Sequence, residues 1–133
     1  MGINVVGIAG SSQRQRRKAH VNQWCTIHIQ QFNTAVGSGA LLSNTTASNN
    51  TAVGYQAAYT NSTGTFATAV GSEALKVSTA DYNTAVGGYA GRATTTGAAN
   101  SFFGTGAGIS NTTGSYNTAI GRSALDANTT ASN

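Results

Sequence analysis

One five-residue motif returns through most of this chain at an almost constant interval. Aligned on its last residue, which is always glycine, six copies lie between residues 33 and 121, and four of them begin Asn-Thr-Ala. Successive copies start 17, 17, 16, 17 and 17 residues apart. A fixed period indicates a structure with the same period, so this repeat constrains the fold more than any other feature.

The length and composition of the unit favour β-structure. A unit of 16 or 17 residues is too short for a helical repeat, which needs about 33 residues. It is also rich in Gly, Thr and Asn, which favour turns and strands. Two strands of about five residues and two tight turns fill such a unit. The sequence therefore predicts an all-β fold, a parallel β-solenoid of about six coils over residues 33–133, roughly 4.8 Å apart and about 29 Å long in total.

Alternation inside the motif divides its residues between two faces, because successive side chains of a strand point in opposite directions. One face carries a Thr column, a mostly aromatic column just before the motif, and an apolar column. We expect the apolar column to point into the coil as the repeat core: Val36, Val53, Val70, Val86, Phe103 and Ile120. The other face carries small residues that let a second backbone approach. We expect these alanines at a contact between chains: Ala35, Ala52, Ala69, Ala85 and Ala119.

The glycine that ends each motif is expected to hold a turn with positive φ, which glycine adopts without penalty. These turn glycines are Gly37, Gly54, Gly71, Gly87, Gly104 and Gly121. The fifth copy departs from the pattern, with Phe102 and Phe103 where other copies have Ala and Val. We expect a local widening of the coil there, or a plug on the axis of an oligomer.

Charge is concentrated before the repeats. Only 8% of the residues are charged, the net charge is +4, and four of the seven basic residues are Arg14, Arg16, Arg17 and Lys18. From residue 33 onward there are three basic and three acidic residues, so the repeat domain is neutral. A neutral rod argues against binding nucleic acid along its length. We expect residues 1–32 to be a basic docking segment that contacts other proteins of the same assembly.

The sequence offers little material for catalysis or cofactor binding. The three acidic residues are well separated along the sequence, which does not suit paired-carboxylate chemistry. His20, Cys25 and His28 could form a zinc site or a Cys–His nucleophile, but a structural role is preferred because no further ligand or orienting group can be named. The apolar stretch at residues 2–10 is too short to span a membrane. We expect no enzyme activity, cofactor or metal, and one cysteine excludes an intrachain disulfide.

The pattern NTAVGxxAL…NTTGxxNTAVG over residues 33–133 resembles the head repeats of trimeric autotransporter adhesins and, more closely, repeats of bacteriophage and cyanophage tail fibres. The resemblance implies a left-handed parallel β-roll, three chains wrapped into a homotrimer, and a role in attachment. The adhesins carry a coiled-coil stalk and a membrane anchor that this sequence lacks, so a fibre or spike component is the preferred expectation. It would lie on a virion or an extracellular surface and contact a host glycan or protein receptor.

Three alternatives remain open from the sequence: a bacterial surface adhesin, a self-assembling extracellular filament subunit, and an ice-binding solenoid. Five glycosylation triplets would suit a glycosylated filament, although they also arise by chance in Asn/Thr-rich turns: Asn44, Asn49, Asn61, Asn111 and Asn128. A regular threonine column suggests ice binding, but it shares the face of the apolar column and is therefore expected to be buried: Thr34, Thr51, Thr68, Thr84 and Thr118. A thin core with many alanines favours an obligate oligomer.

Overall fold

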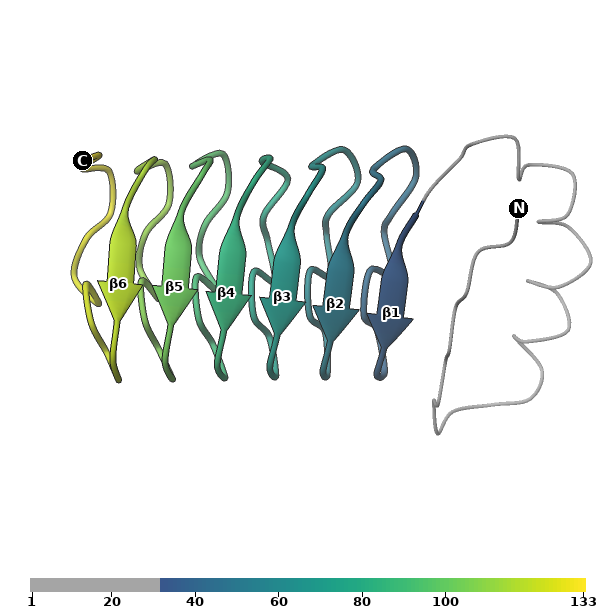
Figure 1. Ribbon diagram of the computed structural model, residues 1–133, viewed down its shortest axis with the longest axis horizontal. Coiled ribbons are helices and arrows are strands. Elements are labelled where there is room, and N and C mark those ends of the chain that lie inside the picture. The colour runs from purple at the N-terminus through teal and green to yellow at the C-terminus, as the bar shows by residue number, and fades with distance from the viewer. Residues whose placement is uncertain (1–31) are drawn as a thin grey trace, which may run out of the picture.

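The computed structural model describes residues 32–133, and within this range the chain is all-β and contains no helix. Each repeat contributes one short strand: β1 (Thr34–Val36), β2 (Thr51–Val53), β3 (Thr68–Val70), β4 (Thr84–Val86), β5 (Ser101–Phe103) and β6 (Thr118–Ile120). The strands form a single parallel sheet in chain order, and the chain completes a coil between neighbours (Figure 1). The predicted parallel β-solenoid is confirmed.

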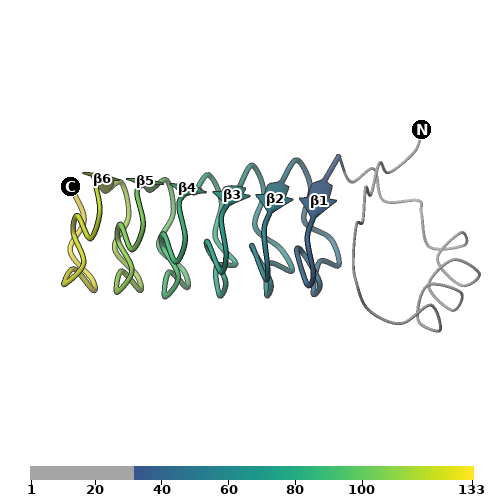
Figure 2. The same ribbon diagram turned by 90° about the horizontal axis from the view of Figure 1, so that it is seen from below.

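The strand register explains why the motif repeats. Thr34 pairs with Thr51, Ala35 with Ala52 and Val36 with Val53, and the same register continues to β6. Identical side chains therefore stack in columns, and each coil rests on a copy of itself. Figure 2 shows the strands along one side of the rod, with the rest of each coil forming the other walls.

The remainder of each coil consists of turns, where the sequence predicted a second strand of about five residues. Gln56 and Ala58 have φ values of 51° and 48°, which interrupts an extended conformation. Hydrogen bonds between coils continue through this part, as from the N–H of Ala58 to the carbonyl of Ala74 (2.9 Å). The expected second strand was wrong because alternate residues here are left-handed, although coil-to-coil pairing is kept.

The two faces of the strand lie the other way round from the expected arrangement. The alanine column is buried inside the coil, with Ala52, Ala69 and Ala85 fully inaccessible to solvent. The apolar column lies on the outside: its four valines are half-buried, Phe103 is 40% exposed and Ile120 is 74% exposed. The predictions of an inward valine core and of interchain contacts through alanine were therefore wrong. The coil is narrow, so the small residues accommodate its own opposite wall.

The asparagine that begins the motif forms hydrogen bonds inside the coil, and these join the start of the coil to its end. The Asn50 amide is buried, and its Nδ2 donates to the carbonyl of Gly64 (2.9 Å) at the end of the same coil. Its Oδ1 accepts from the N–H of Ala67 in the next coil (2.7 Å). The first of these contacts recurs at Asn33, Asn83, Asn100 and Asn117. A buried amide needs such partners, so this column stabilises both coil closure and stacking.

The turn glycines adopt a conformation that other residues rarely do. All six have φ between 121° and 135°. A Cβ at Gly87 would lie 2.6 Å from the carbonyl carbon of Gly104, whereas a Cβ at Gly88 would meet nothing within 4 Å. The motif glycine is thus required by both backbone angle and coil spacing, and the glycine after it is not.

Phe102 packs within its own coil, in place of the expected widening or axial plug. It is fully buried in the alanine column. A Cβ at Gly108 would lie 2.5 Å from the Cε1 of Phe102, and one at Gly91 would lie 2.8 Å from its Cδ2. The position that Gly91 and Gly108 occupy in the repeat carries leucine in three other coils, as at Leu75. The ring therefore occupies space that two missing leucine side chains leave open.

Candidate functional site

The outer side of the β1–β6 sheet is an apolar surface that no other part of residues 32–133 covers. It consists of the apolar column, the threonine column and the aromatic column that precedes each motif, and we call it the strand face. Its exposed large side chains are Phe32, Phe66, Tyr82, Phe103, Tyr116 and Ile120. The rings of Phe66 and Tyr82 stack on each other with centroids 5.4 Å apart.

Large contiguous apolar surfaces on soluble proteins mark sites of interaction. The strand face runs along the whole sheet without a charged side chain in its three columns. Its stacked register makes it regular from β1 to β6, so a second copy of the chain could match it coil for coil. The strand face is therefore the candidate assembly surface, in place of the alanine column.

The threonine column also belongs to the strand face. The expectation that it is buried was wrong, since Thr34 and Thr118 are exposed and the others are half-buried. Exposed rings of Tyr82 and Tyr116 flank the column, and Phe103 interrupts the neighbouring row of valines. Large exposed rings beside the threonines do not suit the ice-binding alternative, although the threonines themselves stack in register from β1 to β4.

A compact charged cluster lies on a different wall of the coil. Glu73 Oε2 accepts a hydrogen bond from Nε of Arg92 (2.6 Å) and lies 3.2 Å from Nζ of Lys76. The hydrogen bond from Arg92, with a smaller contribution from Lys76, lowers the pKa of Glu73 below its ordinary value of 4.5. The Arg92 guanidinium also lies 5.9 Å from the ring centroid of Tyr89. These contacts hold Arg92 in one orientation.

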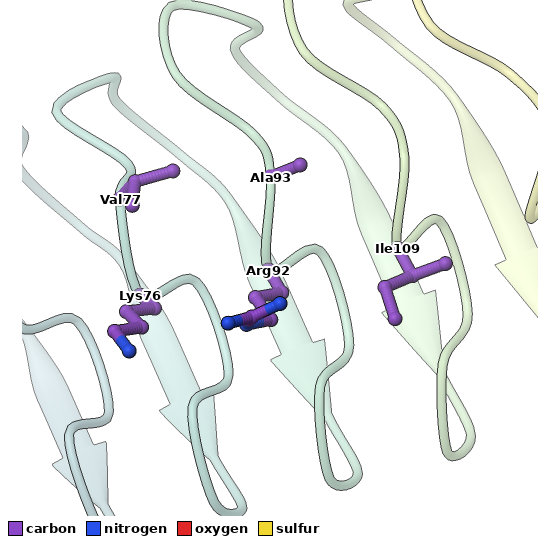
Figure 3. A pocket seen from close by; sticks show the side chains of 5 residues that line it. All are labelled: Lys76, Val77, Arg92, Ala93 and Ile109. Atoms are coloured by element: carbon purple, nitrogen blue, oxygen red, sulfur yellow. The ribbon is translucent and has the colours of Figure 1, made fainter.

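A shallow hollow of about 270 Å³ opens beside this cluster. Its lining comes from three successive coils: Lys76, Val77, Arg92, Ala93 and Ile109. Figure 3 looks onto the wall that lies in front of the strands, with Arg92 extending toward the coil that carries Lys76. The lining combines two cations with three apolar side chains, those of Val77, Ala93 and Ile109.

This cluster was not predicted from the sequence, although the repeat period contains the necessary signal. Lys76 and Arg92 are 16 residues apart, which is one repeat, so they occupy the same column in adjacent coils. Glu73 precedes Lys76 by three residues and reaches both. Aligning the variable residues by repeat, as was done for the motif, would have placed these charges side by side.

Two of the glycosylation triplets are inaccessible in the folded chain. Asn61 and Asn111 are buried, and their Nδ2 atoms donate to Gly64 (3.0 Å) and Gly114 (2.9 Å), respectively. Nδ2 is the atom that would carry a glycan. These asparagines build turns, while Asn49 is exposed.

The remaining predicted sites lie outside the described residues. These are the basic run Arg14, Arg16, Arg17 and Lys18, and the candidate metal or nucleophile group His20, Cys25 and His28. Within residues 32–133, no group of three or more His, Cys, Asp or Glu side chains is arranged to hold a metal ion. The same residues include no helix with the length and apolar character to cross a membrane.

Comparisons with family models, with curated proteins and with solved structures find no significant match to this chain. The fold and the two surfaces described above are therefore the features that bear on function.

Proposed function

We propose that this chain is a structural attachment protein, a component of a virion tail fibre or spike that assembles as a homotrimer. The observation that carries the proposal is the strand face, a continuous uncharged surface along the neutral rod, with Val70 and Val86 half-buried and Ile120 exposed. The resemblance of the repeats to tail-fibre sequences supports the same assignment.

Assembly through the strand face fits the energetics of a thin solenoid. The core of residues 32–133 is mostly alanine, with Leu41, Leu75 and Phe102 as its large side chains. Alanines bury little apolar area at about 25 cal/mol per Å², while each ordered residue loses about 1–2 kcal/mol of backbone entropy. Packing three strand faces around one axis would bury the valines and aromatic rings as a second core.

The alternative of a glycosylated filament is weakened, because two of the five glycosylation triplets, Asn61 and Asn111, are buried in turns. A bacterial surface adhesin would use the same trimeric rod, but a membrane anchor would hold the rod in place of a virion. The fibre assignment places residues 1–32 against other virion proteins and leaves the walls away from the strand face to contact a host receptor.

The assembly face can be tested by cross-linking. In a Cys25→Ser background, we expect Val70→Cys to form covalent links between chains with a short bismaleimide. Ser72→Cys, two residues away in an exposed turn, should not link. Links through Ser72→Cys and none through Val70→Cys would place the contact elsewhere.

The attachment role needs a separate experiment. Antibodies against the repeat domain should label fibres or spikes of particles from the native source in electron micrographs. The purified chain should also bind host cells and compete with those particles for adsorption. Labelling of endless polymers without particles would favour the filament, and failure to bind cells would contradict attachment.

A further inference from the structure

The wall that carries the charged cluster presents different side chains in different coils. The residue three places after the motif glycine is always alanine, and the asparagine and glycine columns are nearly constant. The residues two and five places after that glycine vary in size and charge, and we call these two columns the variable wall. They include Gln56, Tyr59, Glu73, Lys76, Tyr89, Arg92 and Ile109. A constant scaffold that displays variable side chains is typical of a recognition surface.

The variable wall would stay accessible if the chain assembles through the strand face. Figure 3 shows Lys76, Arg92 and Ile109 on the wall in front of the strands, which lie behind them. Trimer formation therefore would not cover the hollow that these residues line.

We propose that this hollow binds a carboxylated sugar, as part of a host-surface glycan. The inference deepens the proposed function, because it names the chemistry of the receptor and the residues that contact it. Lys76 and Arg92 supply two positive charges against the single negative charge of Glu73, so the cluster has a net charge of +1 in a neutral repeat domain.

The contacts of Arg92 orient its guanidinium group so that it can bind a carboxylate. Its Nε is bound to Glu73, its side chain is 47% exposed, and its orientation is fixed by Glu73 and the Tyr89 ring. The contact through Nε leaves the terminal amino groups of the guanidinium for a second acceptor. A guanidinium fork matches the two oxygens of a carboxylate, and Lys76 adds a point charge beside it.

The apolar lining residues of the hollow favour a sugar ring over a simple anion. Val77, Ala93 and Ile109 provide an apolar surface that the C–H groups of a pyranose can cover. The volume of about 270 Å³ is just below the ~300–1,000 Å³ of sites for drug-sized ligands, so it suits one ring. A long polyanion such as nucleic acid would find no continuing row of cations, because Arg122 is the only other basic residue from position 33 onward.

The test is a titration of the purified, isotope-labelled chain with trigalacturonate, followed by NMR chemical shifts. We expect the largest changes at the Arg92 Nε–H and the Ile109 methyl groups. Galactotriose, which lacks the carboxylates, should bind at least tenfold more weakly. Sodium phosphate at the same concentration should not shift the Ile109 methyl groups.

Two variants remove one positive charge each and so form a matched pair. Arg92→Gln should weaken trigalacturonate binding at least tenfold, while Arg122→Gln, in an exposed turn of the last coil, should leave it within twofold. Equal losses in the two variants, equal binding of galactotriose, or no shift at millimolar trigalacturonate would overturn the site. Host-cell binding by the Arg92→Gln chain separates the two proposals: intact cell binding rejects this receptor chemistry alone, and absence of cell binding by the wild type rejects attachment itself.

Discussion

Removal of the Phe102 side chain tests whether the coil interior is packed as the structure describes. The ring is fully buried and lies against the backbones of Gly91 and Gly108. Phe→Ala substitutions in cores cost about 3–5 kcal/mol, since they lose burial and leave a cavity. We expect Phe102→Ala to lower the free energy of unfolding by that amount, a large part of the roughly 5–15 kcal/mol of a typical domain.

A second substitution should recover much of this loss. In Gly108→Leu alone, the new Cβ would lie 2.5 Å from Phe102, and such overpacking costs about 1–3 kcal/mol. The left-handed conformation at Gly108 strains any leucine placed there, but the fold already tolerates that strain at Leu125, which has the same φ of 59°. The double variant Phe102→Ala/Gly108→Leu recreates the Ala and Leu pairing of other coils, as Ala69 and Leu75 show. We expect it to be more stable than Phe102→Ala by about 2 kcal/mol, because the leucine fills part of the cavity that the missing ring leaves.

The assay is urea unfolding followed by far-ultraviolet circular dichroism, with all variants at one protein concentration. Leu42→Ala, which trims an exposed apolar side chain on the variable wall, is the control and should change stability by less than about 0.5 kcal/mol. Additive losses in the double variant would refute the packing described for Phe102, as would an equally large loss in Leu42→Ala.

Three further predictions follow from the columns. Gly87→Val should destabilise the chain by several kcal/mol more than Gly88→Val, measured as urea midpoints, because only Gly87 combines positive φ with a backbone 2.6 Å from the new Cβ. Asn100→Ala should cost about 1–3 kcal/mol, since it leaves buried partners unpaired, and Asn49→Ala on the surface should be nearly neutral in the same assay. The lowered pKa of Glu73 means that its charged form stabilises the fold above pH 4.5. This contribution disappears as the pH falls through the lowered pKa. The melting temperature should therefore drop more between neutral and acid pH in the wild type than in Glu73→Gln.

The sequence was sufficient to predict the stacking direction and the repeat unit. Alignment of the motif on Gly37, Gly54 and the later glycines gives the parallel register directly, because a nearly constant spacing lets identical residues stack in successive coils. The structure keeps that register through the one coil of 16 residues, between β3 and β4. Periodicity therefore determined the fold class without any relative for comparison.

The inside and outside of the strand could not be predicted from alternation alone. A period of two separates Ala69 from Val70 but does not say which side faces the interior. Hydrophobicity favours burying valine, and the width of the coil overrides this preference because its opposite wall comes too close for branched side chains. The evidence was around the fifth copy, where Phe102 is accompanied by Gly108 in the same repeat and by Gly91 in the repeat before it, which shows that the column of Ala69 shares an interior with the leucine column.

The charged site was partly visible in the sequence. The spacing of Lys76 and Arg92 predicts neighbours on adjacent coils once the solenoid is accepted. Their shared contact with Glu73 and the hollow beside Ile109 depend on turn conformations with positive φ, such as 56° at Glu73. Propensity favours other conformations for these residues, so only the structure supplies that geometry.

Sedimentation equilibrium of the wild-type chain at micromolar concentration tests the central claim, that the strand face joins copies of this chain. The proposal predicts one species with three times the 13.4 kDa mass of the chain, and a β-type circular dichroism spectrum under the same conditions. A folded species of 13.4 kDa would contradict it, because one chain would then be stable with Ile120, Tyr116 and the other side chains of the strand face exposed to water.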